Sequence, residues 1–254
     1  MDRREAMLRE LNLYPLWKRR GQPAPIEAVV PNATSRLGGG EADTQQSAMG
    51  IATLNPSYLS SPSDGGQEIA NLDWPQLKEV VRDCTACKLR AGCTQTVFGV
   101  GDEKADWLFV GEGPGADEDA QGEPFVGQAG KLLDSMLAAI KLKRGTNVYI
   151  ANIVKCRPPD NRTPAADEIA QCLPYLERQI ELIQPKLIVA LGKTAATALL
   201  GKDATIGSLR GTLHDYHGIP LIVTYHPAYL LRSPTEKAKA WQDLCFATDT
   251  MQKL

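Results

Sequence analysis

Four cysteines have a spacing that could hold a metal centre. Cys84 and Cys87 are separated by two residues, and Cys156 and Cys172 follow further along the chain. Four thiolates suit either a tetrahedral zinc ion or a cubane iron–sulfur cluster. Zinc sites usually show two tight cysteine pairs, so the wide spacing of the second pair favours a cluster. Free thiols throughout are the alternative, and Cys93 is a rival to Cys87 as a ligand.

A stretch that mixes glycines with acids, GEGPGADEDAQGEPFVG, occupies residues 111–127. Glycine-rich loops after a strand usually bind phosphate, but the carboxylates here would repel it. Gly111 and Gly113 begin a dinucleotide fingerprint, yet Pro114 and a run of acids follow where that motif requires a helix. The pattern therefore argues against a dinucleotide cofactor.

The GKT sequence at residues 192–194 looks like the end of a Walker phosphate loop. That motif requires an earlier glycine at the position of Leu187, so the interpretation fails. Lys193 and Thr194 nevertheless stand at the start of an expected helix, and a helix N-terminus can bind a single backbone phosphate.

Four short apolar runs rich in β-branched residues predict the strands that position these side chains. They occupy residues 107–111, 147–154, 186–192 and 220–227. Strands that are buried on both faces of a parallel sheet have this continuous apolar character. Helical patterns surround the runs at residues 74–84, 129–141, 165–183, 193–200 and 235–253. The alternation predicts an α/β fold, a three-layer α/β/α sandwich around a four-stranded, mainly parallel sheet, with a hairpin at residues 210–225.

The polar residues that follow the apolar runs should meet in one cleft, because ligands of open parallel sheets bind beyond the carboxyl ends of the strands. Four segments are involved: the stretch that begins at Gly111, Asn152 at the end of the second run, the GKT turn, and His226 after the fourth run. We therefore expect one polar cleft assembled from separate parts of the chain.

The first 73 residues differ in composition from the rest of the 254-residue chain. Residues 1–20 have the pattern of an amphipathic helix. Residues 21–73 are rich in glycine, proline and serine and predict a flexible, disordered linker, which leaves residues 74–254 as the folded domain. One interpretation is a small docking or solvated helix, and the other is an arm that contacts DNA or an unidentified partner protein.

Charge and hydropathy restrict the partners and the location of the protein. The net charge is −2, so a nucleic-acid partner would need a local basic patch. The N-terminus does not have the pattern of a signal peptide, and no apolar run approaches the length that spans a membrane. We expect a cytoplasmic, monomeric protein without a membrane partner.

Taken together, several motifs resemble those of the family-4 uracil-DNA glycosylases, the iron–sulfur type. They are CTACKLR, GEGPGADEDAQGEPFVG, YIANIVKCRPP, ALGKTAA and YHPAYLLR, in this order within residues 74–254. The resemblance implies excision of uracil from single- or double-stranded DNA, and a [4Fe–4S] cluster on Cys84, Cys87, Cys156 and Cys172. The related group that links covalently to its product carries a basic insertion with a histidine after the second strand, where this chain has IVKCRPPDNRTP.

A uracil ligand would explain the acidic glycine-rich stretch, because the base is neutral. Main-chain groups of Gly111, Glu112 and Gly113 can bond the edge of the base, and Phe125 can stack on it, although core packing is the ordinary role of a lone phenylalanine. Glu112 or Glu118 could orient the attacking water; the alternative is that the sugar cation needs little help from a side chain.

The base itself would be recognised by Asn152 and its departure assisted by His226. The Asn152 amide offers an acceptor for N3–H of uracil and a donor for O4, a pattern that cytosine reverses. A hydrogen bond from His226 to O2 would stabilise the negative charge that grows on the leaving base. The alternatives are a turn-forming asparagine and a structural histidine. We expect Asp117 and Asp119 at the solvated surface.

The resemblance also assigns residues to DNA. Leu230 and Leu231 would wedge into the space that the base leaves, and Arg232 would bind a phosphate, as would Lys193 and Thr194. The expected basic patch comprises Lys155, Arg157, Arg162, Lys193, Arg210 and Arg232. Two other functions stay open from the residues alone: a non-catalytic zinc- or cluster-containing nucleic-acid-binding module, and an electron carrier that uses the cluster.

Overall fold

The computed structural model describes residues 69–254. The expected helix at residues 1–20 and most of the expected linker lie outside the described residues. The end of that linker is described: Ile69 and Leu72 pack against the core, and the Leu72 carbonyl accepts a hydrogen bond from Arg178 Nε at 2.7 Å.

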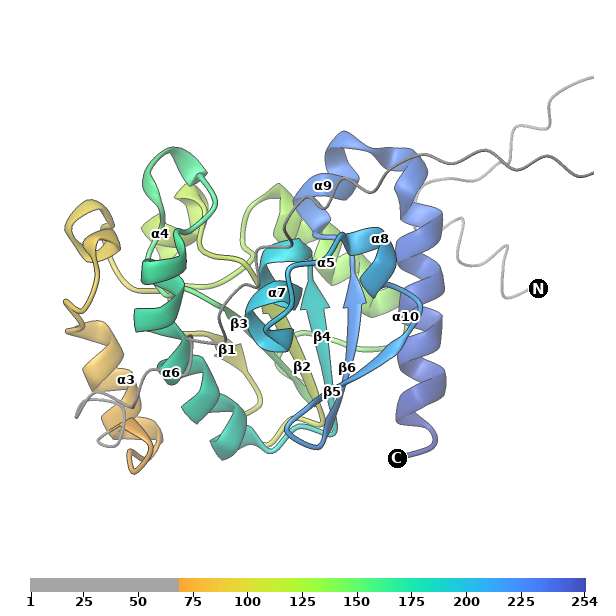
Figure 1. Cartoon of the computed structure of the whole chain (residues 1–254), viewed down its shortest axis with the longest axis horizontal. Coiled ribbons are helices and arrows are strands. Elements are labelled where there is room, and N and C mark those ends of the chain that lie inside the picture. The colour runs from red at the N-terminus through yellow and green to blue at the C-terminus, as the bar shows by residue number, and fades with distance from the viewer. Residues whose placement is uncertain (1–68) are drawn as a thin grey trace, which may run out of the picture. The chain divides into compact units, whose positions relative to one another are not determined.

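A single sheet of six strands forms the centre of the fold, in the order β1-β3-β2-β4-β6-β5 (Figure 1). Its four central strands are parallel and correspond to the four apolar runs: β2 (Trp107–Gly111), β3 (Val148–Asn152), β4 (Leu187–Leu191) and β6 (Ile219–Thr224). All residues of β2, β3 and β4 are buried. This burial explains why these strands are apolar throughout rather than alternating.

The expected four-stranded sheet is corrected by two antiparallel edge strands. β1 (Val100–Gly101) pairs with β3, and β5 (Leu213–Tyr216) pairs with β6. A two-residue strand is too short to show any periodicity, so β1 leaves no sequence signal. β5 is the first arm of the expected hairpin, and it lengthens the sheet rather than only leading into β6. The α/β class is confirmed.

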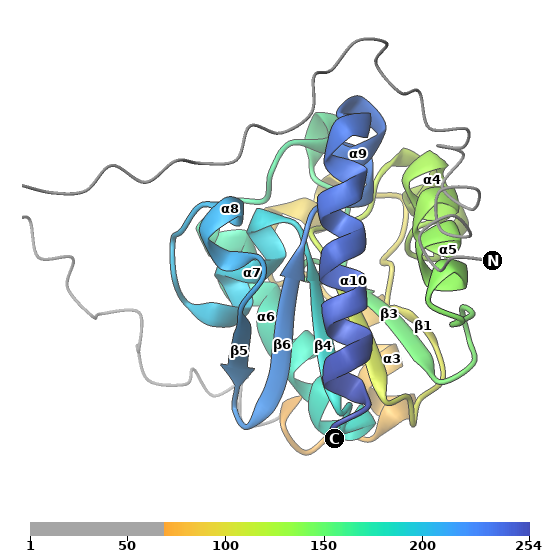
Figure 2. The same ribbon diagram turned by 90° about the vertical axis from the view of Figure 1, so that its right-hand side faces the viewer.

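Helices cover both faces of the sheet, as the two buried hydrophobic clusters show. One cluster joins the sheet to α3 (Trp74–Arg82), α6 (Ala166–Ile183), α7 (Lys193–Leu200) and α8 (Ile206–Leu209). The other joins it to α5 (Gln128–Ala139), α9 (Pro227–Arg232) and α10 (Lys237–Met251). In Figure 2 the sheet lies between α7 and α8 on its left and α5 on its right.

Part of the acidic stretch is helical, which the sequence did not indicate. α4 (Ala116–Gln121) begins after Gly115 and ends at Gly122, which has a φ of 79°. Three acids occupy its first turn, where they interact favourably with the positive end of the helix dipole. The acids of this stretch therefore help to form the helix. Within residues 69–254, no helix is long and apolar enough to cross a membrane.

Candidate functional site

The carboxyl ends of the parallel strands converge on one polar cleft of about 500 Å³. Gly111 at the end of β2 is paired in register with Asn152 at the end of β3. On the other side, the Gly192 N–H after β4 donates to the Thr224 carbonyl at the end of β6, at 2.8 Å. Chain connections from β2 and β4 run in opposite directions along the sheet, and such a switch point is where open α/β sheets bind ligands.

Eight of the candidate site residues named from the sequence line this cleft: Glu112, Gly113, Glu118, Phe125, Asn152, Arg162, His226 and Arg232. Gly111 lies directly beneath, in contact with two of them. A Cβ atom on Gly111 would lie 2.4 Å from Asn152 Oδ1 and 2.5 Å from the Phe125 ring, so a side chain at this position would displace both. Glycine is therefore required here by close approach.

Asn152 has a buried side chain whose oxygen has no partner. The residue is 2 % exposed, and Oδ1 makes no hydrogen bond within the described structure. An unsatisfied buried acceptor costs about 1–3 kcal/mol, so its retention needs an explanation. The position of Asn152 in the wall of the cleft supplies one, because a ligand with an N–H group would satisfy it.

The start of α9 fixes the tautomer of His226, and burial keeps its ring neutral. Its Nδ1 accepts the Ala228 N–H at 3.1 Å, so the ring proton of the neutral form is on Nε2. Burial is the main cause that lowers the pKa of His226 to about 4, and Arg232 lowers it further. The imidazole is therefore neutral near pH 7 and is a hydrogen-bond donor through Nε2.

Phe125 has a strained backbone that places its ring beside His226. Its φ is 56°, which is uncommon for a bulky residue, and its ring centroid lies 5.4 Å from that of His226 with the planes tilted by 31°. Arg144 donates to the carbonyl oxygens of Pro124 and Phe125, both at 2.8 Å. A Cβ atom on Gly130 would lie only 1.7 Å from Phe125 O. The sequence analysis did not identify Arg144, which clamps the Phe125 backbone through these two hydrogen bonds, because no motif lies near residue 144.

Glu112 and Thr194 connect the loops that follow β2 and β4. Thr194 Oγ1 donates to Glu112 Oε2, so both side chains lie at the switch point. Thr194, which the sequence assigned to phosphate, thus has an internal partner in this structure. Lys193 is exposed and pairs with Asp203 at 2.9 Å. The structure brings Glu112 into the cleft but places Lys193 and Thr194 outside its lining.

Two acids of the glycine-rich stretch stabilise its conformation. Glu118 accepts hydrogen bonds from the N–H groups of Gly115, Val126 and Gly127 at 2.9–3.1 Å, so it joins the two ends of the segment. The expected surface position of Asp119 is wrong: Asp119 is 5 % exposed and accepts hydrogen bonds from the Thr94 N–H and hydroxyl. It fastens α4 to the segment that follows Cys93. Asp117 is exposed, as expected.

The proposed pair of leucine wedges is corrected for Leu230. Adjacent residues of a helix point in directions about 100° apart, so α9 cannot present both side chains to one ligand. Leu230 is 1 % exposed and belongs to the core on the α5 and α10 side, whereas Leu231 is 43 % exposed. Only Leu231 remains available to contact DNA. Tyr229, which the sequence analysis did not single out, lines the cleft from the same helix.

The expected basic patch loses two of its members. Lys155 is 1 % exposed and therefore interior. Arg210 is largely buried and forms a two-pronged ion pair with Asp243, with N–O distances of 2.6 and 2.9 Å. The sequence shows that a side chain is charged but not whether it points to solvent or to the interior. Arg162, with a half-exposed side chain bonded to Glu168, and Arg232 both line the cleft, so a smaller basic edge remains.

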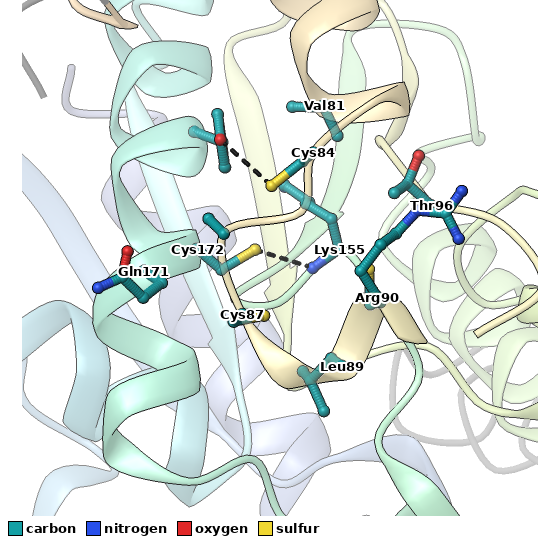
Figure 3. A pocket seen from close by; sticks show the side chains of 12 residues that line it. Val81, Cys84, Cys87, Leu89, Arg90, Thr96, Lys155, Gln171 and Cys172 are labelled. Carbon is teal, nitrogen blue, oxygen red and sulfur yellow. Dashed lines mark hydrogen bonds between the residues drawn. The ribbon is translucent and has the colours of Figure 1, made fainter. Parts of the chain in front are cut away.

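The four cysteines assigned from the sequence line a second, separate pocket, between the segment after α3 and the start of α6. They are Cys84, Cys87, Cys156 and Cys172 (Figure 3 shows three of them with labels). Two sulfurs already accept hydrogen bonds, Cys84 from the Tyr175 hydroxyl at 3.3 Å and Cys172 from the Lys155 N–H at 3.2 Å. Burial is the main cause that raises the pKa of the Cys172 thiol to about 11.

No single-ion metal site is found among the described residues. Around a tetrahedral zinc ion, sulfur atoms lie within about 4 Å of one another. Within residues 69–254, no three histidine, cysteine or acidic groups are close enough to hold one ion. Cys93 is not part of the pocket lining. Burial is the main cause that raises the pKa of the Cys156 thiol, and the nearby Cys93 raises it further. Arg90 donates to the carbonyl and sulfur of Cys93.

Comparison with known proteins identifies relatives of the described domain. Residues 98–245 match the family model of the Uracil DNA glycosylase superfamily. The chain is 46 % identical over 169 residues to a type-4 uracil-DNA glycosylase of Archaeoglobus fulgidus, an alignment that covers 62 % of this chain and 84 % of the relative. It is 42 % identical over 183 residues to a type-4 uracil-DNA glycosylase of Pyrobaculum aerophilum, which covers 68 % and 92 %. A type-5 uracil-DNA glycosylase of Thermus thermophilus is 32 % identical over 149 residues, 51 % of this chain and 68 % of the relative.

Proposed function

This chain belongs to the uracil DNA glycosylase superfamily and, within it, to the type-4 enzymes, and from this premise we propose that its polar cleft binds a uracil base turned out of DNA. The protein is a DNA-repair glycosylase, a hydrolase that cleaves the N-glycosidic bond of deoxyuridine and releases free uracil. The base must leave the helical stack to reach a cleft at the ends of the strands.

The unpaired oxygen of Asn152 is the observation that carries the assignment of the cleft. Uracil presents N3–H beside O4, and the Asn152 amide has the complementary acceptor and donor. Cytosine has an unprotonated N3 beside an amino group, so it would leave the buried oxygen unsatisfied. Sites of this kind discriminate strongly, because the wrong ligand leaves buried polar groups without partners.

His226 acts on the leaving group as a neutral hydrogen-bond donor. As the glycosidic bond breaks, electrons move to the base and negative charge grows on O2. The Nε2–H of His226 donates to that oxygen, while Nδ1 stays bonded to the Ala228 N–H. A fixed donor of this kind stabilises the transition state more than the bound substrate. Phe125 stacks on the base beside it.

The remaining step is attack of water at the sugar carbon. Glu112 lies in the cleft, and its carboxylate is held by the Thr194 hydroxyl, so it is the residue that orients this water. Glu118, the other candidate, already accepts three backbone hydrogen bonds, which supports a structural role instead.

Cys84, Cys87, Cys156 and Cys172 are the ligands of a [4Fe–4S] cluster in this proposal. A cubane binds each of four cysteines at a different iron, and the four cysteines that line this pocket match that number. The hydrogen bonds to Cys84 and Cys172 suit thiolates, and the buried Lys155 side chain in the same wall suits an anionic group. When bound, the cluster would join the segment at residues 84–87 to the chain after β3.

Uracil-containing DNA, single- or double-stranded, is the partner. Arg162 and Arg232 at the cleft supply phosphate contacts, with Lys193 beyond it, and the exposed Leu231 fills the gap that the base leaves. The protein acts as a monomer in the cytoplasm in this proposal. The segment at residues 1–20 contacts DNA or a partner protein.

Release of base from matched oligonucleotides tests the cleft. Oligonucleotides that differ only in one uracil or cytosine are compared under single-turnover conditions for the parent, Asn152→Ala and Asn152→Asp. We expect rapid uracil release by the parent, slow release by Asn152→Ala, and measurable cytosine release only with Asn152→Asp, because a protonated or water-bridged carboxyl can meet the N4 amino group. Equal uracil release by the parent and Asn152→Ala would refute the role of Asn152.

A further inference from the structure

Lys155 is a buried cation whose bonding partners are neutral. The residue is 1 % exposed, and its ammonium donates to Gln179 Oε1 at 2.6 Å and to the Asn152 carbonyl at 3.0 Å. Removing a charge from water costs several kcal/mol unless another charge compensates it. A methionine would fill the same space without that cost, so the positive charge needs a purpose.

One side of Lys155 faces the cysteine pocket. Its side chain is part of the pocket wall, and its own N–H donates to Cys172 Sγ at 3.2 Å (Figure 3). Four cysteine thiolates that bind the proposed cluster form an anionic group, which is the missing counter-charge for the ammonium. The link is also covalent, because Cys156 is the next residue in the chain.

The ammonium of Lys155 contacts Asn152, the residue to which we assign recognition of the base. The Asn152 carbonyl accepts from the ammonium, while the Asn152 side chain lies in the wall of the cleft with its unpaired oxygen. Two residues separate Asn152 from Lys155 in the chain. One of them, Val154, donates its N–H to the Glu112 carbonyl, so the turn after β3 is fastened to the loop after β2. Lys155 is therefore in direct contact with both sites, with Cys172 through its main-chain N–H and with the Asn152 carbonyl through its ammonium.

We propose that Lys155 is a positioning residue that couples the cysteine site to uracil recognition. The thiolate-bound group fixes the ammonium, the ammonium fixes the Asn152 carbonyl, and the Asn152 amide is thereby set for the base. This inference rests on the proposed roles of both sites. Coupling between two sites is reciprocal, so occupancy of the base site must in turn stabilise the group held by the cysteines.

Free uracil is the probe, because it fills the base site without touching the phosphate contacts. The full-length, iron-loaded protein is mixed with an excess of an iron chelator, and the loss of visible absorbance is followed with and without uracil at ten times each variant's own Kd. We expect uracil to slow iron loss in the parent by at least about fivefold, the lower end of usual coupling between sites. In Lys155→Met, iron loss should be faster and the effect of uracil should disappear.

Tyr175→Phe is the matched control. It removes the hydrogen bond to Cys84 Sγ and so weakens the cysteine site without removing a hydrogen bond of Lys155 or Asn152. Iron loss should accelerate, but uracil should still slow it. If Lys155→Met is isolated without iron, Lys155→Arg replaces it, because the planar guanidinium keeps the charge but cannot sit between the same two acceptors. Its uracil effect should be reduced.

Three results would overturn the coupling: no effect of uracil on the parent, an undiminished effect in Lys155→Met or in Lys155→Arg, or equal loss of the effect in Tyr175→Phe. Failure of the proposed function gives a different pattern. A parent protein without iron refutes the cluster, and a parent that releases no uracil from DNA refutes the activity. Iron and activity together with no uracil effect refute the coupling alone.

Discussion

His226 has a separate task for each ring nitrogen. Nδ1 caps the start of α9 by accepting the Ala228 N–H, and Nε2 is left as the donor to the departing uracil. The cap and the donor both require a neutral ring, which its low pKa ensures. The chemistry of this residue therefore depends on burial rather than on a nearby acid.

Removal of the His226 ring should slow catalysis far more than it weakens binding. His226→Ala loses a hydrogen bond that strengthens in the transition state, which costs on the order of 3 kcal/mol, or about a hundredfold in single-turnover rate. Affinity for uracil-containing DNA should change much less, because the phosphate contacts remain. His217, at the opposite end of β6, is the control, and His217→Ala should keep the parent rate. A parent rate in His226→Ala would transfer the role to another donor.

Stability should fall with acid because of the same histidine. The folded-state pKa of about 4 lies below the ordinary value of 6.5, so the unfolded chain binds the proton more readily. The contribution of the neutral ring is fully present above pH 6.5 and is lost as the pH falls towards 4, by about 3 kcal/mol in total. Urea unfolding of the parent and of His226→Gln between pH 7.5 and pH 4 measures it. The pH dependence should be shallower in His226→Gln, and parallel curves would contradict the assignment.

Arg144 should matter for the base although it lies outside the cleft lining. Arg144→Met removes two charge-assisted hydrogen bonds to the Pro124 and Phe125 carbonyls, worth about 1.5–3 kcal/mol each, and lets the positive φ of Phe125 relax. We expect kcat/KM to fall at least about tenfold and free uracil to inhibit less. Asp134→Asn removes only the ion pair with Arg144, and it should behave like the parent. Equal inhibition by uracil in parent and Arg144→Met would refute the clamp.

At the residue scale, sequence reasoning was informative where position along a strand determines position in space. Asn152 and His226 follow apolar runs, so their arrival in one cleft could be expected. Lys155 and Arg210 were assigned to the surface because charge was the only available signal. Their burial depends on Gln179 and Asp243, which lie 24 and 33 residues away in sequence, and no local pattern announces such partners.

At the scale of elements, α9 shows how a helix divides adjacent residues between core and ligand. Leu230 packs with α5 and α10, while Leu231 is exposed. The motif shows that both leucines follow His226, but the direction in which each points depends on the rotation of the helix. α9 has only six residues, which is too few for a helical periodicity to be recognised in the sequence.

The two leucines should give opposite results when shortened. Leu230→Ala should destabilise the fold by about 2–5 kcal/mol in urea unfolding, as core truncations do. Leu231→Ala should leave stability unchanged but slow uracil release from double-stranded DNA, where a gap in the stack must be filled, more than from single-stranded DNA. The ratio of the two rates is the measurement. An unchanged ratio in Leu231→Ala would exclude a wedge.

The acidic stretch and the sheet edges show the same limit of local patterns. Four strands and most helices could be located within a few residues, because long apolar runs and helical periodicity persist after folding. α4 was missed because its residues are polar, and it is stabilised by Glu118 and Asp119 through contacts at its ends. β1 exists only through pairing with β3.

At the scale of the whole molecule, the described domain contains every residue to which we assign chemistry. The cleft, the cysteine pocket and the family match at residues 98–245 all lie within residues 69–254. Ile69 and Leu72 pack against the core of this domain, so a division at residue 74 would remove part of its support.

A chain that begins at residue 69 should therefore retain the glycosylase activity. Single-turnover release of uracil from a short oligonucleotide should be nearly unchanged, because every residue to which we assign base recognition or the leaving-group contact lies within residues 69–254. A chain that begins at residue 74 is the comparison: it loses the Leu72 carbonyl that accepts from Arg178 and the packing of Ile69, and it should unfold at lower urea while its rate stays similar. A large drop in the single-turnover rate of the chain that begins at residue 69 would mean that the N-terminal segment belongs to the active site. A drop only in affinity for long DNA would instead support the DNA-contacting arm.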